Sequence, residues 1–163
     1  VYYVAETKDQ ILTSLLLLSP SDMLGLVRAE AEQFKKDIAE ANEFIQSGNS
    51  EKILSDWVWG NPVSARTYMS LFGDNAKDAI FNFYDSEDTL PVLGKITIPA
   101  YAVMGRKDDA LTIPIEDTFR RMEQALSASP LVKTEILGNA NHGYRGHEQE
   151  LVSAVQMWIA SFK

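Results

Sequence analysis

Short apolar runs and amphipathic stripes alternate at both ends of the chain. Runs at residues 13–19 and 101–104 are typical of strands buried on both faces of a parallel sheet, and residues 131–137 are predicted to form a third strand. Residues 115–126 and 148–162 place apolar side chains every three or four positions, as an amphipathic helix does. Strands that alternate with helices indicate βαβ units with right-handed crossovers. The pattern therefore predicts an α/β fold with a partial parallel sheet of about three core strands, flanked by helices.

The middle of the chain shows a different pattern, without a strand signal. One apolar stripe predicts a single long helix over residues 23–46. Its members are Met23, Val27, Ala31, Phe34, Ile38, Ala41 and Ile45. Residues 50–95 have the character of several short helices broken by glycines and prolines. We therefore expect residues 1–20 and 96–163 to form the sheet layer, and residues 21–95 to form a helical insertion.

Composition and charge narrow the range of functions. The chain has 163 residues, 45% of them hydrophobic, which suits one domain with a substantial core. A formal net charge of −8 without a long basic run argues against nucleic-acid binding, because phosphate contact needs clustered Lys and Arg. The absence of cysteine removes disulfides, thiol catalysis and thiolate metal sites, and fits a reducing, cytoplasmic setting. The longest apolar run, Leu15–Leu18, is far too short to cross a membrane, so no membrane partner is expected.

Two strand ends carry the residues with the clearest chemistry. The sequence MGRKDD follows the second predicted strand, and NANHGY follows the third. Neighbouring parallel strands end on the same edge of a sheet, so Asp108 and His142 can lie side by side. An Asp that accepts the Nδ1 proton of a His fixes the tautomer and makes the ring a competent general base. Gly105 is expected to turn the chain sharply so that Asp108 points inward, and Asp109 is the fallback acid because two adjacent aspartates leave the register open.

These motifs resemble the C-terminal half of an α/β-hydrolase. The motif IPxYxVxGxxD ends at Asp108; a helix, a strand, the motif GNANH ending at His142 and a last helix with a Trp-Ile pair follow it. In that family the order along the chain is nucleophile, acid, histidine. The resemblance implies that Asp108 is the acid, His142 the base and residues 21–95 a cap or lid. It also implies that residues 13–20 are the strand after the nucleophile helix, and residues 1–9 the tail of that helix.

One element of the family pattern does not occur in the chain. There is no Gly-x-Ser-x-Gly nucleophile elbow, and Ser19 and Ser21 flank a proline after the wrong strand. The resemblance therefore implies an elbow upstream of Val1 and a chain that is inactive by itself. The parent protein is expected to be a serine hydrolase of carboxylic esters or related small acyl substrates, without a cofactor. The same scaffold also uses Asp or Cys as nucleophile, and the alternative is a non-catalytic binding or assembly module.

Other side chains give less specific signals. Trp57, Trp59 and Phe81 could line an acyl pocket, although such rings more often form the core of a helical subdomain. The acidic residues at 85–88 lack the spacing of a calcium loop and indicate a solvated turn. His147 is interpreted as a solvated residue at the start of the last helix, and for His142 the alternative is a loop histidine bonded to the backbone. A nucleotide-binding fold ranks last, since no Gly-rich phosphate loop follows a strand.

The first predicted strand also carries a prediction about partners. If the strand with the nucleophile belongs beside Leu15–Leu18, the edge of the sheet at this run is bare in the chain as given. An exposed apolar edge invites pairing with another chain. We therefore expect self-association through this strand, or poor order there.

Overall fold

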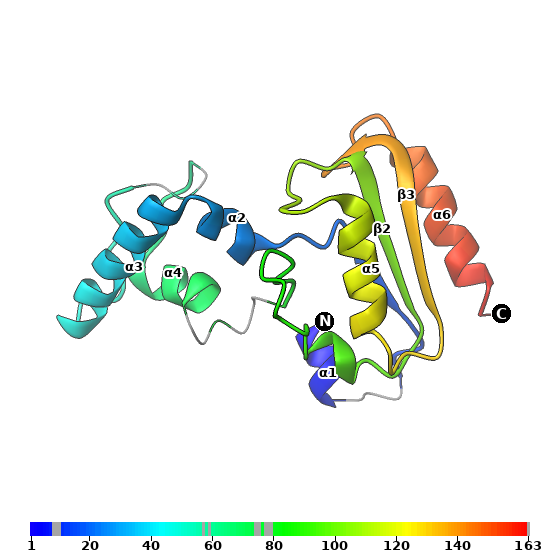
Figure 1. Cartoon of the computed structure of the whole chain (residues 1–163), viewed down its shortest axis with the longest axis horizontal. Helices are drawn as coiled ribbons and strands as arrows, with labels where there is room; N and C mark the ends of the chain where they lie inside the picture. The colour runs from blue at the N-terminus through cyan, green and yellow to red at the C-terminus, as the bar shows by residue number, and fades with distance from the viewer. Residues whose placement is uncertain (8–10, 57, 59, 74–75, 77–79, 163) are drawn as a thin grey trace.

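The computed structural model describes residues 1–7, 11–56, 58, 60–73, 76 and 80–162. The elements in chain order are α1 (Tyr2–Thr7), β1 (Leu15–Leu18), α2 (Met23–Ala29), α3 (Ala31–Gln46), α4 (Ala65–Phe72), the short 3-10 helix η1 (Leu93–Lys95), β2 (Ala100–Lys107), α5 (Ile115–Ala125), β3 (Val132–Asn141) and α6 (Glu148–Ala160). Figure 1 shows two parts beside each other, the sheet with its flanking helices and a group formed by α2, α3 and α4. We call this second group the helical lobe.

The three strands form one parallel sheet in the order β1-β2-β3. Leu17 of β1 pairs with Ala102 of β2, and Val103 of β2 pairs with Glu135 of β3. α5 connects β2 to β3, and α6 follows β3. The predicted α/β class, with a three-stranded parallel sheet flanked by helices, is confirmed. β1 lies at one edge of the sheet, and within the described residues no strand pairs with its outer side.

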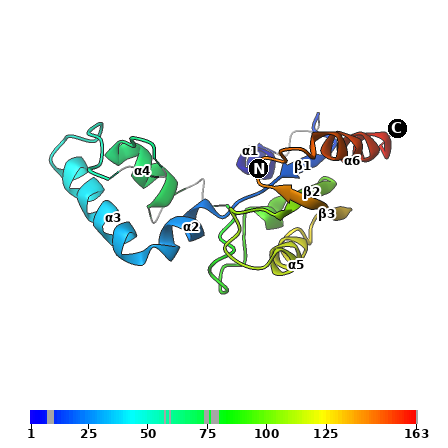
Figure 2. The same ribbon diagram turned by 90° about the horizontal axis from the view of Figure 1, so that it is seen from above.

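Each face of the sheet carries its own hydrophobic cluster. One face packs against α5 and α1, and Leu17, Ala102 and Met122 are buried there. The other face packs against α6, where the ring centroids of Tyr101 and Trp158 lie 5.1 Å apart. Figure 2 shows α5 and α6 on opposite sides of the sheet. Successive side chains of β2 therefore enter different clusters, which explains why this strand is a continuous apolar run.

Gly105 has a different role from the predicted one. It lies inside β2, which continues to Lys107, so the expectation of a sharp turn at Gly105 is wrong. A Cβ atom at this position would lie 2.1 Å from the carbonyl oxygen of Ala140 in β3. Glycine therefore lets the backbone of β3 approach β2 closely at this point. That close approach brings the last residues of the two strands together.

The long helix predicted over residues 23–46 is also wrong, because α2 and α3 are separated at Glu30. Glu30 has φ −92° and ψ 59°, outside the helical region, and its N–H donates to the Val27 carbonyl. The break allows both helices to pack on α4, in a cluster of apolar side chains from all three. The predicted stripe is interrupted at the same place, since Ala31 is exposed, and its first and last members, Met23 and Ile45, are exposed as well.

The described part of residues 50–95 contains little regular structure. It holds α4, η1 and the isolated bridges Ile53–Ser64 and Val58–Asn61. Leu90 is buried in the cluster that α5 forms with the sheet. The second half of this segment therefore packs on the sheet layer, whereas the hydrophobic cluster of the helical lobe ends at α4. Among the described residues, no helix is long and apolar enough to cross a membrane.

Candidate active site

Asp108 is the first residue after β2 and is held by its own loop. Its N–H donates to the Gly105 carbonyl (3.1 Å), and its Oδ1 accepts the Ala110 N–H (2.9 Å). The side chain is 2% exposed. A buried carboxylate that accepts a backbone hydrogen bond is held in one orientation. The loop therefore presents Asp108 as a fixed acceptor at the edge of the sheet.

His142 is the first residue after β3 and meets Asp108 across the strand ends. Its Nδ1 lies 2.9 Å from Asp108 Oδ1. The preceding residues, Lys107 and Asn141, are partners in the register of β2 and β3, so the sheet itself sets this distance. The carboxylate favours the tautomer with the proton on Nδ1, in which Nε2 is the basic nitrogen. The imidazole is 42% exposed and no described residue hydrogen-bonds its Nε2, so this nitrogen is open to an incoming group.

Two polar groups fasten the segment around His142 to the neighbouring strands. The Ser19 hydroxyl donates to the His142 carbonyl oxygen (3.0 Å). The Tyr144 hydroxyl accepts the Ser19 N–H (2.9 Å) and donates to the Val103 carbonyl (2.7 Å). Burial raises the pKa of Tyr144, so its hydroxyl keeps the proton that it donates. This bridge has no local sequence signal, because Ser19 and Tyr144 are 125 positions apart.

The backbone at this bridge is unusual. Ser19 has φ 42° and Tyr144 has φ 55°, both in the left-handed region that residues with a side chain rarely adopt. Such conformations persist where the surrounding contacts determine them. The hydrogen bonds of the two residues to each other and to β2 provide these contacts. The hydroxyl of Ser19 is engaged with the His142 backbone, which separates this serine from a nucleophile role.

Asp109 lies beside the pair rather than in it. The 2.9 Å contact with His142 uses Asp108, while Asp109 is exposed and makes no hydrogen bond or ion pair within the described part of the chain. Together with Met23, Leu26 and Ala110 it lines a pocket of about 300 Å³. The pocket lies between α2 and the loop after β2. The helical lobe thus approaches the strand-end loop next to the candidate acid.

Asp22 ties the helical lobe to this same loop. It is fully buried, and its Oδ1 accepts the Gly25 N–H in the first turn of α2 (2.6 Å). Its Oδ2 accepts the Tyr84 N–H (2.5 Å) and the Thr112 hydroxyl (3.1 Å). Thr112 lies in the loop that begins with Asp108. The buried Asp22 side chain therefore joins three segments by hydrogen bonds: α2, the chain at Tyr84, and the loop after β2, which we call the acid loop.

Of the three predicted pocket aromatics, Trp57 and Trp59 lie outside the described residues. Phe81 packs against the cluster of α5 and the sheet, and its ring centroid lies 5.8 Å from that of Phe83. This is the environment of a core residue. The pocket role of Phe81 stays a prediction, and the residues that do line a pocket near Asp108 were not foreseen.

The acidic turn and the second histidine make local contacts. The Arg121 guanidinium donates to the carbonyl oxygens of Asp85 (2.6 Å) and Asp88 (2.7 Å), which closes the turn. His147 directly precedes α6, and its Nδ1 lies 3.1 Å from Glu150 Oε1. Among the residues that the structure describes, no group of three or more His, Cys, Asp or Glu side chains could hold a metal ion.

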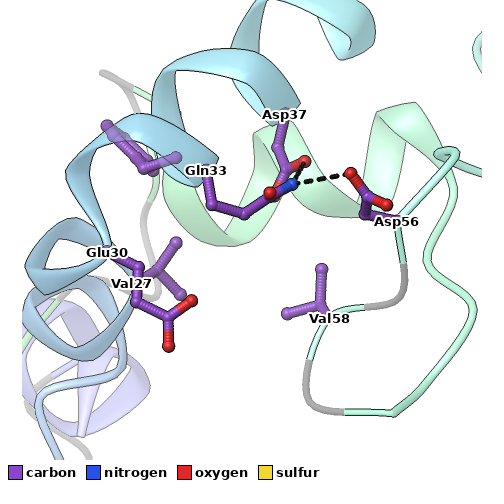
Figure 3. A pocket seen from close by; sticks show the side chains of 7 residues that line it. Val27, Glu30, Gln33, Asp37, Asp56 and Val58 are labelled. Carbon is purple, nitrogen blue, oxygen red and sulfur yellow. Dashed lines mark hydrogen bonds between the residues drawn. The ribbon is translucent and has the colours of Figure 1, made fainter.

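A second pocket, of about 290 Å³, lies in the helical lobe and is lined by Val27, Glu30, Gln33, Phe34, Asp37, Asp56 and Val58. Figure 3 shows the Gln33 side chain between two carboxylates. Its amide nitrogen donates to Asp37 (2.7 Å) and to Asp56 (2.9 Å). Burial raises the pKa of Asp37. A neutral amide joins the carboxylates here, so this pocket lacks the titratable base that Asp108 has in His142.

Comparison with known proteins bears on the fold. No protein-family model matches the chain, and no curated protein matches it. Among solved structures, the chain is similar to one described as "Putative non-heme bromoperoxidase BpoC from Mycobacterium tuberculosis H37Rv", an enzyme of the α/β-hydrolase fold, with a TM-score of 0.55 and 14% sequence identity. The similarity covers 98% of this chain and 62% of that chain, so this chain spans less than two thirds of the neighbour's length. At this identity the similarity shows the fold alone: the chain has an α/β-hydrolase-like fold.

Proposed function

We propose that Asp108 and His142 are the acid and the base of a serine hydrolase triad in the full-length protein. The observation that supports it is the 2.9 Å contact between Asp108 Oδ1 and His142 Nδ1 at the ends of adjacent parallel strands. The buried acid and the half-exposed base match the roles of an orienting carboxylate and a general base. The nucleophile in this proposal comes from a segment outside the chain, on a strand beside the outer edge of β1.

The reaction follows from the free Nε2 of His142. This nitrogen accepts the proton of the serine hydroxyl while the serine oxygen attacks the ester carbonyl. Asp108 stabilises the imidazolium, which then gives the proton to the departing alkoxide. A water molecule next gives a proton to Nε2 and attacks the acyl-enzyme. The proton returns to the serine oxygen as the carboxylic acid leaves.

The substrate class in this proposal is a small carboxylic ester or a related acyl compound. The helical lobe would act as a cap, because α2 reaches the loop that begins with Asp108 and borders the pocket at Asp109. The name of the structural neighbour carries no activity to this chain, since one fold supports many reactions and the site decides among them.

Fluorophosphonate labelling read by intact mass tests the proposal. We expect the full-length protein to gain one adduct and this chain alone to gain none. His142→Ala and Asp108→Asn in the full-length protein should suppress labelling. The matched controls are His147→Ala and Glu150→Gln, because these residues form another His–carboxylate contact at 3.1 Å and should not affect labelling. If the full-length protein does not label, the serine hydrolase proposal fails, and an Asp nucleophile or a non-catalytic module takes its place.

We also propose that this chain, when alone, self-associates by pairing β1 with β1 of a second copy. β1 has an unpaired outer edge among the described residues, and Leu18 at its end is 44% exposed. Such edges template pairing with another strand, and a charged side chain on the edge prevents it. Sedimentation of this chain should show a dimer that Leu18→Lys makes monomeric. Met157→Lys, at a 60% exposed apolar position on α6, is the control. A wild-type chain that is monomeric at high concentration contradicts the idea.

A further inference from the structure

The pocket between α2 and the loop after β2 adjoins the acid of the Asp108–His142 pair. On one side, the Ala110 N–H in the pocket lining donates to Asp108 Oδ1 at 2.9 Å. On the other side, Met23 begins α2, four residues after the Ser19 whose hydroxyl binds the His142 carbonyl at 3.0 Å. A group held in this pocket would therefore lie beside the loop that carries the acid.

The pocket has fixed walls. Asp22 binds the first turn of α2 at Gly25 and the acid loop at Thr112. Because Asp22 is fully buried, these bonds exclude water and hold the two walls at one spacing. Groups on rigid elements discriminate between ligands better than groups on loose ones. The volume of about 300 Å³ is at the lower end for ligand pockets, which favours a small substituent.

The lining combines apolar surface with one unpaired charge. Met23 is 42% exposed although it is large and apolar, and Leu26 is half-buried beside it. The Asp109 carboxylate makes no hydrogen bond or ion pair within the described residues, in contrast to its neighbour Asp108. An apolar wall next to a free carboxylate suits an aliphatic group that carries a positive charge. The net charge of −8 favours the approach of cations as well.

We propose that this pocket, with Met23 and Leu26 as its apolar wall and Asp109 as its charge, binds the part of the ester substrate next to the scissile bond and selects substrates with a cationic, alkylammonium-like group there. The inference rests on the proposed hydrolase function and adds the substrate class. Asp109 is in this view a specificity-determining residue, and its adjacency to Asp108 places recognition and proton transfer in one loop.

Two esters of nearly equal shape separate charge from size: acetylcholine and 3,3-dimethylbutyl acetate. The full-length protein should have a higher kcat/KM for the cationic ester. Asp109→Asn should lower the ratio of the two kcat/KM values about fivefold, the effect of a partly exposed charge pair. Glu87→Gln removes the same charge from the exposed acidic turn and should leave the ratio unchanged. Leu26→Ala should lower kcat/KM for both esters.

Binding of the alcohol halves tests the pocket without any chemistry. Choline and 3,3-dimethylbutan-1-ol are titrated into the full-length protein, and the amide signals of Leu26 and Ala110 are followed by NMR. Tighter binding of choline than of the neutral alcohol, lost in Asp109→Asn, supports the proposal. Equal affinities overturn it, even if both esters are hydrolysed. Preferential choline binding by a protein that fails to label with a fluorophosphonate would overturn the hydrolase function while leaving the cationic pocket.

Discussion

Two buried carboxylates, one at the sheet edge and one in the helical lobe, show how the same group serves different ends. The side chain of Asp108 is buried, and Asp37 is a buried residue of α3. Asp108 accepts the Ala110 N–H and faces the His142 ring at 2.9 Å. Asp37 accepts the Gln33 amide at 2.7 Å, and a second carboxylate, Asp56, binds that same amide. Both carboxylates are withdrawn from solvent, and their partners differ.

The partners decide what each carboxylate can do. A neighbour that can become positively charged, as His142 can, makes Asp108 useful for stabilising a proton on the ring. A neutral amide and a nearby carboxylate give Asp37 no such role, and burial raises its pKa. The first arrangement is suited to proton transfer, and the second is a structural element that costs stability when it is ionised.

The largest effect expected from this comparison is on activity. In the proposed hydrolase, Asp108→Asn should lower kcat by about 10⁴-fold, because an amide cannot stabilise the imidazolium and favours the wrong tautomer. Asp37→Asn, the matched change in the helical lobe, should leave kcat within about twofold of wild type, because Asp37 binds Gln33 and has no contact with Asp108 or His142. Ester hydrolysis by the two variants measures the difference. Equal losses would show that the two carboxylates are not functionally distinct.

The next effect is on stability and concerns the glycine that brings β2 and β3 together. In Gly105→Ala the new Cβ would lie 2.1 Å from the Ala140 carbonyl oxygen, so the strands must separate. We expect a loss of about 3 kcal/mol in the free energy of unfolding, at the upper end for overpacking. Separation should also lengthen the Asp108–His142 contact. Urea unfolding measures the first effect, and the NMR titration of His142 the second.

Gly138→Ala is the control for this substitution. Gly138 also lies in the sheet, in β3, but a Cβ there would meet only the Glu150 carboxylate at 4.0 Å. Its free energy of unfolding should change by less than about 1 kcal/mol. If both glycine variants unfold alike, the close approach at Gly105 is not what sets the strand spacing.

The sequence predicts those features of the site that follow from the alternation of strands and helices along the chain. Asp108 and His142 each follow a predicted strand, and parallel strands end on one edge, so their proximity follows from two local patterns. The sequence does not indicate the bridge of Ser19 and Tyr144, because neither residue belongs to a periodic pattern and 125 positions separate them. Long-range contacts of this kind depend on the assembled fold.

The helical lobe was harder to predict for a related physical reason. The apolar stripe over residues 23–46 has helical period, yet the chain leaves the helical region at Glu30. Tertiary packing on α4 overrides the local preference there, as it commonly does. At Gly105 the sequence predicts a turn at the end of the strand. The structure instead uses this glycine for the close approach of β3. In both places the decisive partner lies outside the local sequence.

A smaller effect is expected at the bridge that supports His142. Tyr144→Phe removes the hydroxyl that bridges Ser19 and Val103, but the Ser19 N–H still donates to the Val103 carbonyl at 2.9 Å, so the cost should be about 1 kcal/mol. Because Ser19 also holds the His142 carbonyl, the ring should shift relative to Asp108, which weakens its preference for the Nδ1 proton, and kcat should fall while KM is unchanged. Nitrogen NMR of the ring measures the tautomer, and urea unfolding measures the cost.

Tyr101→Phe is the matched control for the bridge. Its buried hydroxyl donates to Glu135 at 2.6 Å, and this bond is the main cause that lowers the pKa of Glu135. The variant should raise the pKa of Glu135 and cost about 1 kcal/mol of stability at neutral pH, without any change at the His142 ring. A tautomer change in both tyrosine variants would mean that the ring responds to general loosening of the sheet.

The smallest expected effect concerns Asp37 and the way its contribution to the free energy of unfolding depends on pH. Burial raises the folded pKa of Asp37 above the unfolded value of about 3.9, so the folded state binds this proton more tightly. The contribution of Asp37 to stability is therefore greatest below the unfolded pKa and falls as pH rises through the folded pKa. Asp37→Asn keeps an oxygen for Gln33 and removes the charge, so it should stabilise the chain by about 1 kcal/mol at pH 7.

This gain should shrink as the pH falls, because wild-type Asp37 is then protonated and neutral like the asparagine. Asp56→Asn should change stability in the opposite direction, since a hydrogen bond from Lys36 lowers the pKa of Asp56. Stability from Asp56 is present above its unfolded pKa and lost as the pH falls, so this variant should be less stable than wild type near neutrality. Urea unfolding at several pH values measures both slopes. If Asp37→Asn destabilises the chain at pH 7, then the ionised form of Asp37 is stabilised by the fold. The contrast between Asp37 and Asp108 would then be wrong.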